Sequence, residues 1–443
     1  MIFQAWQNKS ILILGFGLEG QSTLRFLRKH FPDKEIFIAD RDSNLPEQHP
    51  DLKQVSWITG KKYLDNVTEF DVIIKSPGVA LSEAKNSLIT SQTDIFLQQF
   101  RKQVIGVTGT KGKSTTASLI HHIIQKQFPD SLFIGNIGTP PLDKYSEIGS
   151  HAPVVHEISA HQLQHIHVAP HIAVFMNLFE EHLDHFGSKE QYFEAKRNIL
   201  LRQNNDDRSV LNAEETLNGN LDACGNYPAH VYRFALNKGE EVHAWIENQE
   251  IIYAGEGDTT RFALHDFKLP GKHNQLNAMA AVIVAKQLGI RDDLIADALR
   301  TFNGLPHRLE QIAVKEGITF YNDAISTVPE TTLQALKTLP DTHTLILGGF
   351  DRGIEYGSLL KFLESSAVQQ LIFTGPAGKR MQKHYKGNQH TVSLDDMQEI
   401  VNYAHQNTPS GKICLLSPAA ASYDRYKNFE ERGNAYRKAI EKI

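Results

Sequence analysis

Short apolar runs alternate with amphipathic helical stretches along most of the chain, a pattern typical of α/β proteins built on parallel sheets. The N-terminal part predicts strands at residues 10–14, 35–39 and 71–74. The C-terminal part predicts strands at residues 318–323, 344–349, 370–374 and 412–417, again separated by helical stretches. We therefore expect a Rossmann-like sheet at each end of the chain.

The middle of the chain continues this alternation. Its strands are predicted near residues 104–105, 133–138, 154–159, 173–178 and 210–212. Residues 227–267 alternate apolar and polar positions, which favours a β-rich insert, and a long alanine-rich helix begins after Gly271. The expected result is a mostly parallel central sheet that carries the insert.

A glycine-rich loop follows the first central strand and precedes a helical pattern; it reads T-G-T-K-G-K-S-T at residues 108–115. Backbone N–H groups of such a loop surround phosphate oxygens, and the helix N-terminus adds a favourable dipole. Lys113 would reach the terminal phosphates and Ser114 would hold Mg²⁺. Val107 stands where the general pattern has its first glycine, so Gly109 is the nearer one. A glycine turn that only caps the helix is the alternative.

The first predicted strand runs into Gly15-Phe-Gly17-Leu-Glu-Gly20, and the second ends at Asp40. This spacing is the dinucleotide-binding fingerprint, with an acid placed for a ribose. By itself it favours an NAD-dependent oxidoreductase, and the alternative is a similar unit that binds another nucleotide or none. Ligands of open parallel sheets bind at the carboxyl ends of the strands. The residues expected to line this crevice are Gly17, Leu18, Asp40, Arg41 and Gly78.

Acidic and histidine residues follow two further central strands. Glu157 lies near the end of one, where phosphate-loop enzymes have an acid for Mg²⁺, although an exposed edge-strand glutamate is the alternative. Residues 179–185 contain glutamate, histidine and aspartate after another strand. Their proximity to a phosphate loop favours metal or phosphate chemistry.

Composition limits the classes of function. The chain has 443 residues, of which 41% are hydrophobic and 22% charged, as in soluble proteins of two to four domains. A net charge of -5 gives no reason to expect nucleic acid. The two cysteines match no metal-ligand spacing and fit a reducing compartment, and no apolar run is long enough to span a bilayer. We expect a cytoplasmic monomer that binds no nucleic acid and does not insert into membranes.

Six motifs, in order over most of the chain, resemble those of the Mur ligases of peptidoglycan synthesis, in particular the MurD type. They are G-T-K-G-K-S-T at 109–115, G-N-I-G at 135–138, H-E-I-S-A-H-Q-L at 156–163, N-L-F-E-E-H-L-D at 177–184, E-A-K at 194–196 and G-K-H-N-Q-L-N-A at 271–278. The resemblance implies three domains: residues 1–96 for a UDP-sugar, residues 97–301 for ATP and residues 302–443 for an amino acid.

The resemblance also implies site residues, position by position. The ATP site would contain Gly109, Thr110, Lys111, Gly112, Lys113, Ser114, Thr115, Asn274 and Arg308. Two Mg²⁺ ions would be held by Ser114, Glu157, His182 and Lys196, the last after carbamylation. The UDP-linked substrate and the amino acid would contact Gly17, Leu18, Asp40, Arg41, Gly78, Asn136, Ser159, Thr327, Arg352, Ser422, Tyr423 and Phe429. Catalytic roles would belong to Lys113, His182, Lys196, Arg308 and Asp323. Without the resemblance, Lys196 would be taken for an ordinary solvated helix lysine.

Two positions in the last domain depart from the pattern of D-glutamate-adding members. Ile325 stands where those members commonly have a lysine, and Arg352 replaces a second lysine. Arg352 still offers a bidentate partner to a carboxylate, whereas Ile325 removes a potential one.

We therefore expect an ATP-dependent amide ligase that adds glutamate to UDP-N-acetylmuramoyl-L-alanine through an acyl phosphate and releases ADP and phosphate. D-Glutamate is favoured, and addition of L-glutamate is the alternative. The further alternatives are a Mur-type ligase for another amino acid, an NAD-dependent oxidoreductase and a non-catalytic nucleotide-binding protein.

Overall fold

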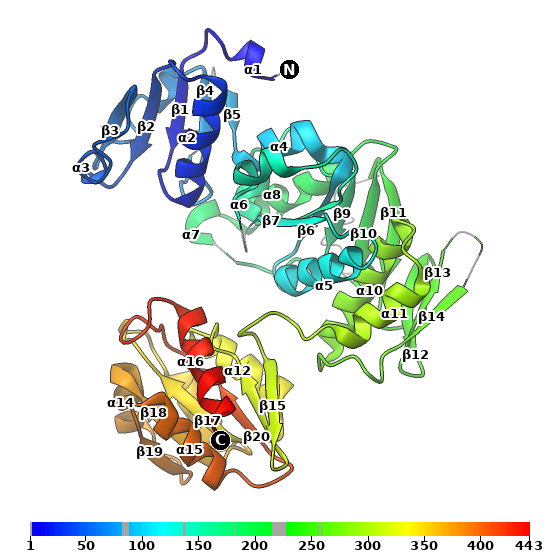
Figure 1. Ribbon diagram of the computed structural model, residues 1–443, viewed down its shortest axis with the longest axis vertical. Helices are drawn as coiled ribbons and strands as arrows, with labels where there is room; N and C mark the ends of the chain where they lie inside the picture. The colour runs from blue at the N-terminus through cyan, green and yellow to red at the C-terminus, as the bar shows by residue number, and fades with distance from the viewer. Residues whose placement is uncertain are drawn as a thin grey trace. The chain divides into compact units, whose positions relative to one another are not determined.

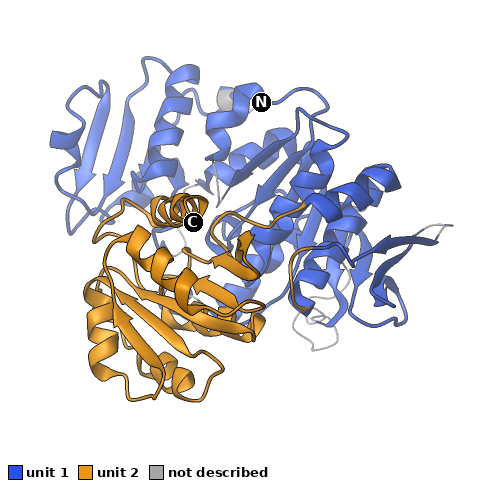
Figure 2. Ribbon diagram, turned by 60° about the horizontal axis from the view of Figure 1, so that its bottom comes forward, with its two compact units in different colours: residues 1–267, 272–301 blue, residues 268–271, 302–443 orange. Residues whose placement is uncertain are grey.

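The computed structural model describes residues 2–81, 88–135, 139–181, 183–214, 227–255, 257 and 259–443. The α/β class predicted from the sequence is confirmed, with three mostly parallel sheets (Figure 1). The chain divides into two compact units, the first comprising residues 1–267 and 272–301 and the second residues 268–271 and 302–443 (Figure 2). Within the described residues no helix is long and apolar enough to cross a membrane.

The first sheet has five parallel strands in the order β3-β2-β1-β4-β5. These are β1 (Ile11–Leu14), β2 (Ile36–Asp40), β3 (Val55–Thr59), β4 (Val72–Lys75) and β5 (Leu88–Thr90). The helices around it are α1 (Ile2–Ala5), α2 (Leu18–His30), α3 (Leu45–Gln48) and η1 (Val67–Glu69), and α4 (Gln92–Phe100) leads from β5 towards the second sheet. Strands β1 and β4 are buried at every position, as expected for a parallel sheet with both faces covered.

The second sheet has nine strands in the order β14-β13-β12-β11-β10-β9-β6-β8-β7. These are β6 (Val104–Thr108), β7 (Leu132–Gly135), β8 (Val154–Glu157), β9 (Ile172–Phe175), β10 (Arg208–Asn212), β11 (His230–Phe234), β12 (Val242–Glu247), β13 (Glu250–Ala254) and β14 (Thr259–Ala263). The predicted β-rich insert continues this same sheet: β11 and β12 extend it in parallel, and β13 and β14 add antiparallel strands.

The helices that belong to the second sheet are η2 (Arg101–Gln103), α5 (Lys113–Gln125), η3 (Pro141–Glu147), α6 (Ala160–Leu163), α7 (Leu183–Phe186), α8 (Lys189–Leu201), α10 (Lys272–Gln287) and α11 (Asp292–Thr301). Most of these helices lie in the connections between its strands, whereas η2 precedes the first of these strands and α10 and α11 follow the last. Helix α10 is built almost entirely of buried residues from Asn277 to Ala285. Its apolar composition is therefore explained by packing on all sides.

The third sheet forms the core of the second unit, in the order β15-β16-β20-β17-β18-β19. Its strands are β15 (Glu310–Lys315), β16 (Ile318–Asn322), β17 (Thr342–Gly348), β18 (Gln370–Thr374), β19 (His390–Ser393) and β20 (Ile413–Leu416). Its helices are α12 (Pro329–Thr338), α13 (Gly357–Glu364), α14 (Gly375–His384), α15 (Met397–Asn407) and α16 (Phe429–Glu441). Only β15 is antiparallel to its neighbour among these strands.

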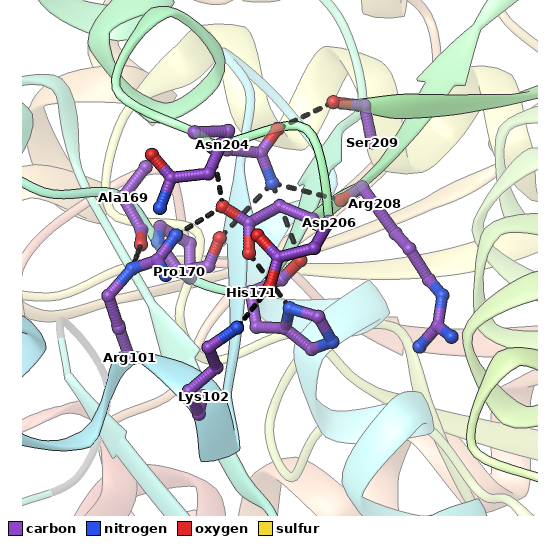
Figure 3. Close-up of polar contacts among 11 residues, drawn as sticks. Arg101, Lys102, Ala169, Pro170, His171, Asn204, Asp206, Arg208 and Ser209 are labelled. Atoms are coloured by element: carbon purple, nitrogen blue, oxygen red, sulfur yellow. Dashed lines mark hydrogen bonds and ion pairs between the residues drawn. The ribbon is translucent and has the colours of Figure 1, made fainter. Parts of the chain in front are cut away.

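The buried residue Asp207 lies where several central strands begin, and Figure 3 shows Arg101, His171 and Asn204 of the polar network around it. Its carboxylate accepts a hydrogen bond of 2.6 Å from the backbone N–H of Asn204 and lies 2.8 Å from Nδ1 of His171. The same carboxylate pairs with Arg101, which also donates to the carbonyl oxygen of Ala169 at 3.0 Å. These contacts fix the starts of β6, β9 and β10, at the edge opposite the glycine-rich loop.

Candidate active site

The glycine-rich loop between β6 and α5 is held in place by the segment that follows β9. The backbone N–H of Thr110 donates to the carbonyl oxygen of Asn177 at 2.9 Å, and that of Lys111 donates to Oδ1 of Asn177 at 2.7 Å. Gly112 precedes α5 with a φ of 83°, a conformation that favours glycine. The first N–H groups of α5 have no acceptor within the helix, so the loop and the helix start form an anion-binding arrangement.

Ser114 and Glu157 meet beside this loop, as the sequence suggested. The hydroxyl of Ser114 donates to Oε1 of Glu157 at 3.1 Å, and both residues are buried. The contact follows from the topology, because β6 and β8 are adjacent parallel strands with Val107 opposite Glu157. The alternative of an exposed edge-strand glutamate is wrong, since β8 lies between β6 and β7.

Two lysines donate to the same loop carbonyl. Nζ of Lys113 lies 2.9 Å from the carbonyl oxygens of both Gly109 and Thr110, and Nζ of Lys196 lies 2.7 Å from that of Gly109. Lys196 projects from α8 and is only 1% exposed, so it is not a solvated helix lysine. Burial, reinforced by the charge of Lys113, holds the pKa of Lys196 well below its usual range. The shift favours the neutral amine, which is the nucleophilic form.

Helix α10 contacts the first turn of α5, which follows the glycine-rich loop. Asn277 accepts a hydrogen bond of 3.0 Å from the hydroxyl of Thr116 and donates one of 3.0 Å to Oδ1 of Asn274. Asn274, an expected ATP contact, is therefore linked through Asn277 to the first turn of α5. Asn177 and Asn277 were missed as site residues, although both lie in the motifs at 177–184 and 271–278.

The loop after β1 and the end of β2 come together in the first sheet. Asp40 accepts hydrogen bonds from the backbone N–H groups of Phe16 at 2.7 Å and Asp42 at 2.9 Å. Its carboxylate thus supports the shape of both loops. A Cβ built on Gly17 or Gly78 would meet no atom within 4 Å, and Leu18 is 80% exposed. Open space next to these backbone positions suits the approach of a ligand.

A chain of hydrogen bonds connects the first sheet with the central one. Ser159 and Gln162 form a reciprocal capping box at the start of α6, and Nε2 of Gln162 donates to Oε1 of Glu19 at 2.8 Å. Burial raises the pKa of Glu19 and lowers the pKa of the nearby Lys75 to about 8. Sequence reasoning missed the pair of Glu19 and Lys75, since only Glu19 lies within a motif.

In the second unit, Arg308 lies on a constrained loop next to a buried acid. The residues on either side, His307 and Leu309, have φ values of 65° and 43°. The backbone N–H of Leu309 donates to Asp323 at 3.2 Å, and the hydroxyl of Ser417 donates to the other carboxylate oxygen at 2.7 Å. Burial raises the pKa of Asp323 to about 6. Asp323 therefore holds the loop that carries Arg308.

The residues expected to bind the amino acid come from the segments after β16, β17 and β20. Nη2 of the exposed Arg352 donates to the carbonyl oxygen of Thr327 at 2.7 Å. Ser422 is buried, whereas Tyr423 is 66% exposed and its ring lies 6.3 Å from that of Phe350. Phe429 is the first residue of α16.

Two expected site residues, Asn136 and His182, lie outside the described residues. In the described ranges, no group of three or more histidine, cysteine, aspartate or glutamate side chains is placed to hold a metal ion. The metal candidates that the structure does describe are Ser114, Glu157 and Lys196.

Two family profiles match the sequence: the Mur ligase middle domain over residues 107–285, and the N-terminal domain of MurD-like Mur ligases over residues 9–94. The UDP-N-acetylmuramoylalanine–D-glutamate ligase of Ruminiclostridium cellulolyticum is 33% identical over 458 residues, covering 99% of this chain and 97% of that protein. The protein of the same name from Symbiobacterium thermophilum is 32% identical and covers 97% of each chain.

Solved structures of Mur ligases have the same fold. MurF ligase from Thermotoga maritima in complex with ADP aligns with a TM-score of 0.56 at 17% identity, covering 98% of this chain and 96% of that one. The UDP-N-acetylmuramate-alanine ligase MurC of the same organism aligns with a TM-score of 0.56 at 19% identity, covering 98% and 100%. At these identities the likeness supports the fold alone, while the full-length relatives establish the family. The chain belongs to the Mur ligase family and, within it, to the MurD type.

Proposed function

We propose that this protein is an ATP-dependent amide ligase of peptidoglycan precursor synthesis that adds D-glutamate to UDP-N-acetylmuramoyl-L-alanine. The observation that carries the proposal is full-length similarity, at 30–33% identity, to proteins named UDP-N-acetylmuramoylalanine–D-glutamate ligase. The phosphate loop beside Glu157 is consistent with it. The rival NAD-dependent oxidoreductase leaves this loop and acid without a role.

We assign the ATP phosphates to the loop at residues 109–115, with Lys113 and Arg308 as their cationic contacts. Asn274 would contact the adenine. The pair formed by the Ser114 hydroxyl and the Glu157 carboxylate is the oxygen donor set that Mg²⁺ prefers. When bound, Mg²⁺ would neutralise charge on the transferring phosphoryl group.

We assign a second Mg²⁺ to Lys196 after carbamylation, together with His182. Carbamylation joins the neutral amine to CO₂ with loss of a proton and converts a cation into an oxygen ligand. The low exposure and lowered pKa of Lys196 fit this chemistry, because a buried ammonium beside Lys113 is unfavourable.

The UDP-linked substrate is assigned to the domain at residues 1–96, in the crevice at the carboxyl ends of β1, β2 and β4. Its proposed contacts are Gly17, Leu18, Asp40, Arg41 and Gly78, with Asn136 and Ser159 from the central domain at 97–301. The glutamate is assigned to the domain at 302–443. Its proposed contacts are Thr327, Arg352, Ser422, Tyr423 and Phe429.

A free carboxylate is a poor acyl donor because its leaving group would be oxide, so it must be activated before an amine can attack. A carboxylate oxygen of UDP-N-acetylmuramoyl-L-alanine attacks the γ-phosphorus of ATP, and ADP leaves. The glutamate amine then attacks the acyl carbon, phosphate leaves and the nitrogen loses a proton. Lys113 and Arg308 stabilise the charge on the phosphoryl group, and Asp323 positions the loop of Arg308. We further propose that the protein works as a monomer in the cytoplasm.

The proposal is tested by phosphate release with ATP, Mg²⁺ and UDP-N-acetylmuramoyl-L-alanine, with D- or L-glutamate assayed separately. Release that depends on D-glutamate is expected, and it should disappear in Lys113→Ala. Release only with L-glutamate would identify the alternative amino acid. ATP binding without turnover would identify a non-catalytic protein, and NADH binding would favour the oxidoreductase.

A further inference from the structure

Arg432, in the first turn of α16, is an almost completely buried cation. It is 3% exposed, and its guanidinium donates to four backbone carbonyl oxygens. Nη1 donates to Gly348 at 3.4 Å and Ala421 at 3.2 Å, and Nη2 donates to Ala324 at 2.9 Å and Ala420 at 3.0 Å. Within the described part of the chain, no carboxylate forms an ion pair with this guanidinium.

Burial of the Arg432 guanidinium carries a cost. Burying this charge carries a desolvation penalty that the attraction of the nearby Asp424 carboxylate offsets only in part, and a cation near a helix N-terminus opposes the helix dipole. Burial lowers the pKa of Arg432 only to about 10, so it stays charged at neutral pH. An apolar side chain of similar length would fill the same space but would provide no donor to the four carbonyl oxygens. The guanidinium is planar and forked: its N–H donors point in fixed directions, so this fork can bridge several carbonyls at once.

The four carbonyls lie on three separate segments at the carboxyl ends of adjacent strands. Strands β16, β20 and β17 are neighbours in the sheet. Ala324 precedes Ile325 and Thr327, Gly348 leads to Arg352, and Ala420 and Ala421 precede Ser422 and Tyr423. A single side chain is therefore bonded to every segment that carries a proposed amino-acid contact, and Phe429 belongs to its own helix.

We propose that Arg432 is a positioning residue for the glutamate pocket, which sets the distances among the segments after β16, β17 and β20 that bind the amino acid. This inference rests on the proposed function. Its consequence is selective: loss of the fork should weaken glutamate binding, while the ATP loop of the first unit keeps its contacts. A displacement of even about 1 Å in such a pocket is enough to impair a ligand-dependent reaction.

The test compares steady-state constants of wild type, Arg432→Lys and Arg432→Met with ATP, UDP-N-acetylmuramoyl-L-alanine and D-glutamate. The lysine variant keeps the charge but loses the fork. Tyr436→Leu is the matched control, because Tyr436 is buried on the same helix but contacts Cys414 in the middle of β20. This control should lower the melting temperature without removing a donor from any of the four carbonyls.

We expect the KM for glutamate to rise about tenfold or more in both Arg432 variants, with the KM values for ATP and the UDP-linked substrate within about twofold of wild type. Tyr436→Leu should leave all three KM values unchanged. Equal glutamate KM values in wild type and Arg432→Lys would overturn the proposal. An Arg432→Lys variant that does not fold would also overturn it, because the residue would then act in the fold alone. Absence of glutamate-dependent turnover in wild type would instead reject the proposed function.

Discussion

The amino group of Lys196 donates a hydrogen bond of 2.7 Å to the carbonyl oxygen of Gly109, 87 residues earlier in the chain. This contact places the lysine against the phosphate loop, where Lys113 donates to the same oxygen. Two amino groups at one carbonyl repel each other when both are charged. Burial lowers the pKa of Lys196, the more buried of the two, and the proximity of Lys113 lowers it further.

Replacing Lys196 by Gln should reduce turnover by about 10- to 100-fold or more, because it removes the amine that would become a metal ligand. With ¹³C-labelled bicarbonate, the wild type should show a carbamate signal by ¹³C NMR that the variant lacks. Lys189→Gln, at the exposed start of the same helix, should keep both the signal and the activity. A wild type with no carbamate signal would contradict this prediction.

Gly112→Ala should raise the KM for ATP about tenfold, because the loop must change shape to accept a side chain. The residue has a φ of 83°, and an added Cβ would lie 2.9 Å from Oδ1 of Asn277. Gly357→Ala is the control, since a Cβ there meets nothing within 4 Å. An unchanged ATP KM in Gly112→Ala would show that the loop is not the phosphate site.

Asp323 should make stability depend on pH between about 4 and 6. Its pKa is raised by burial from 3.8 to about 6, so the folded state binds the proton more tightly than the unfolded state. The resulting stabilisation is fully present below the unfolded pKa and is lost as the pH rises through the folded value. The difference is on the order of 3 kcal/mol.

Urea denaturation of wild type and Asp323→Asn across this range measures the effect. The neutral variant should gain stability relative to wild type as the pH rises from about 4 to 6, and the difference should be constant above about pH 7. Parallel pH profiles for the two proteins would show that Asp323 does not titrate in this range.

Asp207 and Asp206 are adjacent in sequence, but replacing each by alanine should have very different effects on the stability of the fold. Asp207 is completely buried and holds Arg101, His171 and the Asn204 N–H, so Asp207→Ala should cost about 3–5 kcal/mol. Asp206 forms an exposed pair with Lys102, so Asp206→Ala should leave the stability almost unchanged. Thermal denaturation of both variants checks this, and similar losses would contradict the structural distinction.

The sequence by itself determined the α/β class, the position of the glycine-rich loop and the family. These features depend on local patterns: buried strands read as apolar runs, and the loop at 109–115 is continuous in the chain. The strands that went unpredicted are β3, β5, β15 and β19, which lie at sheet edges. Half-exposed edge strands carry little hydrophobic signal, so their position depends on pairing with a neighbour.

Only the tertiary structure decided which side chains meet and in which direction their pKa values shift. Ser114 and Glu157 are 43 residues apart, and Arg432 bonds Ala324 from 108 residues away. The burial that lowers the pKa of Lys196 and raises the pKa of Asp323 comes from elements distant in sequence. A pKa and a pocket shape are properties of the surroundings of a group, and those surroundings exist only once the strands are side by side.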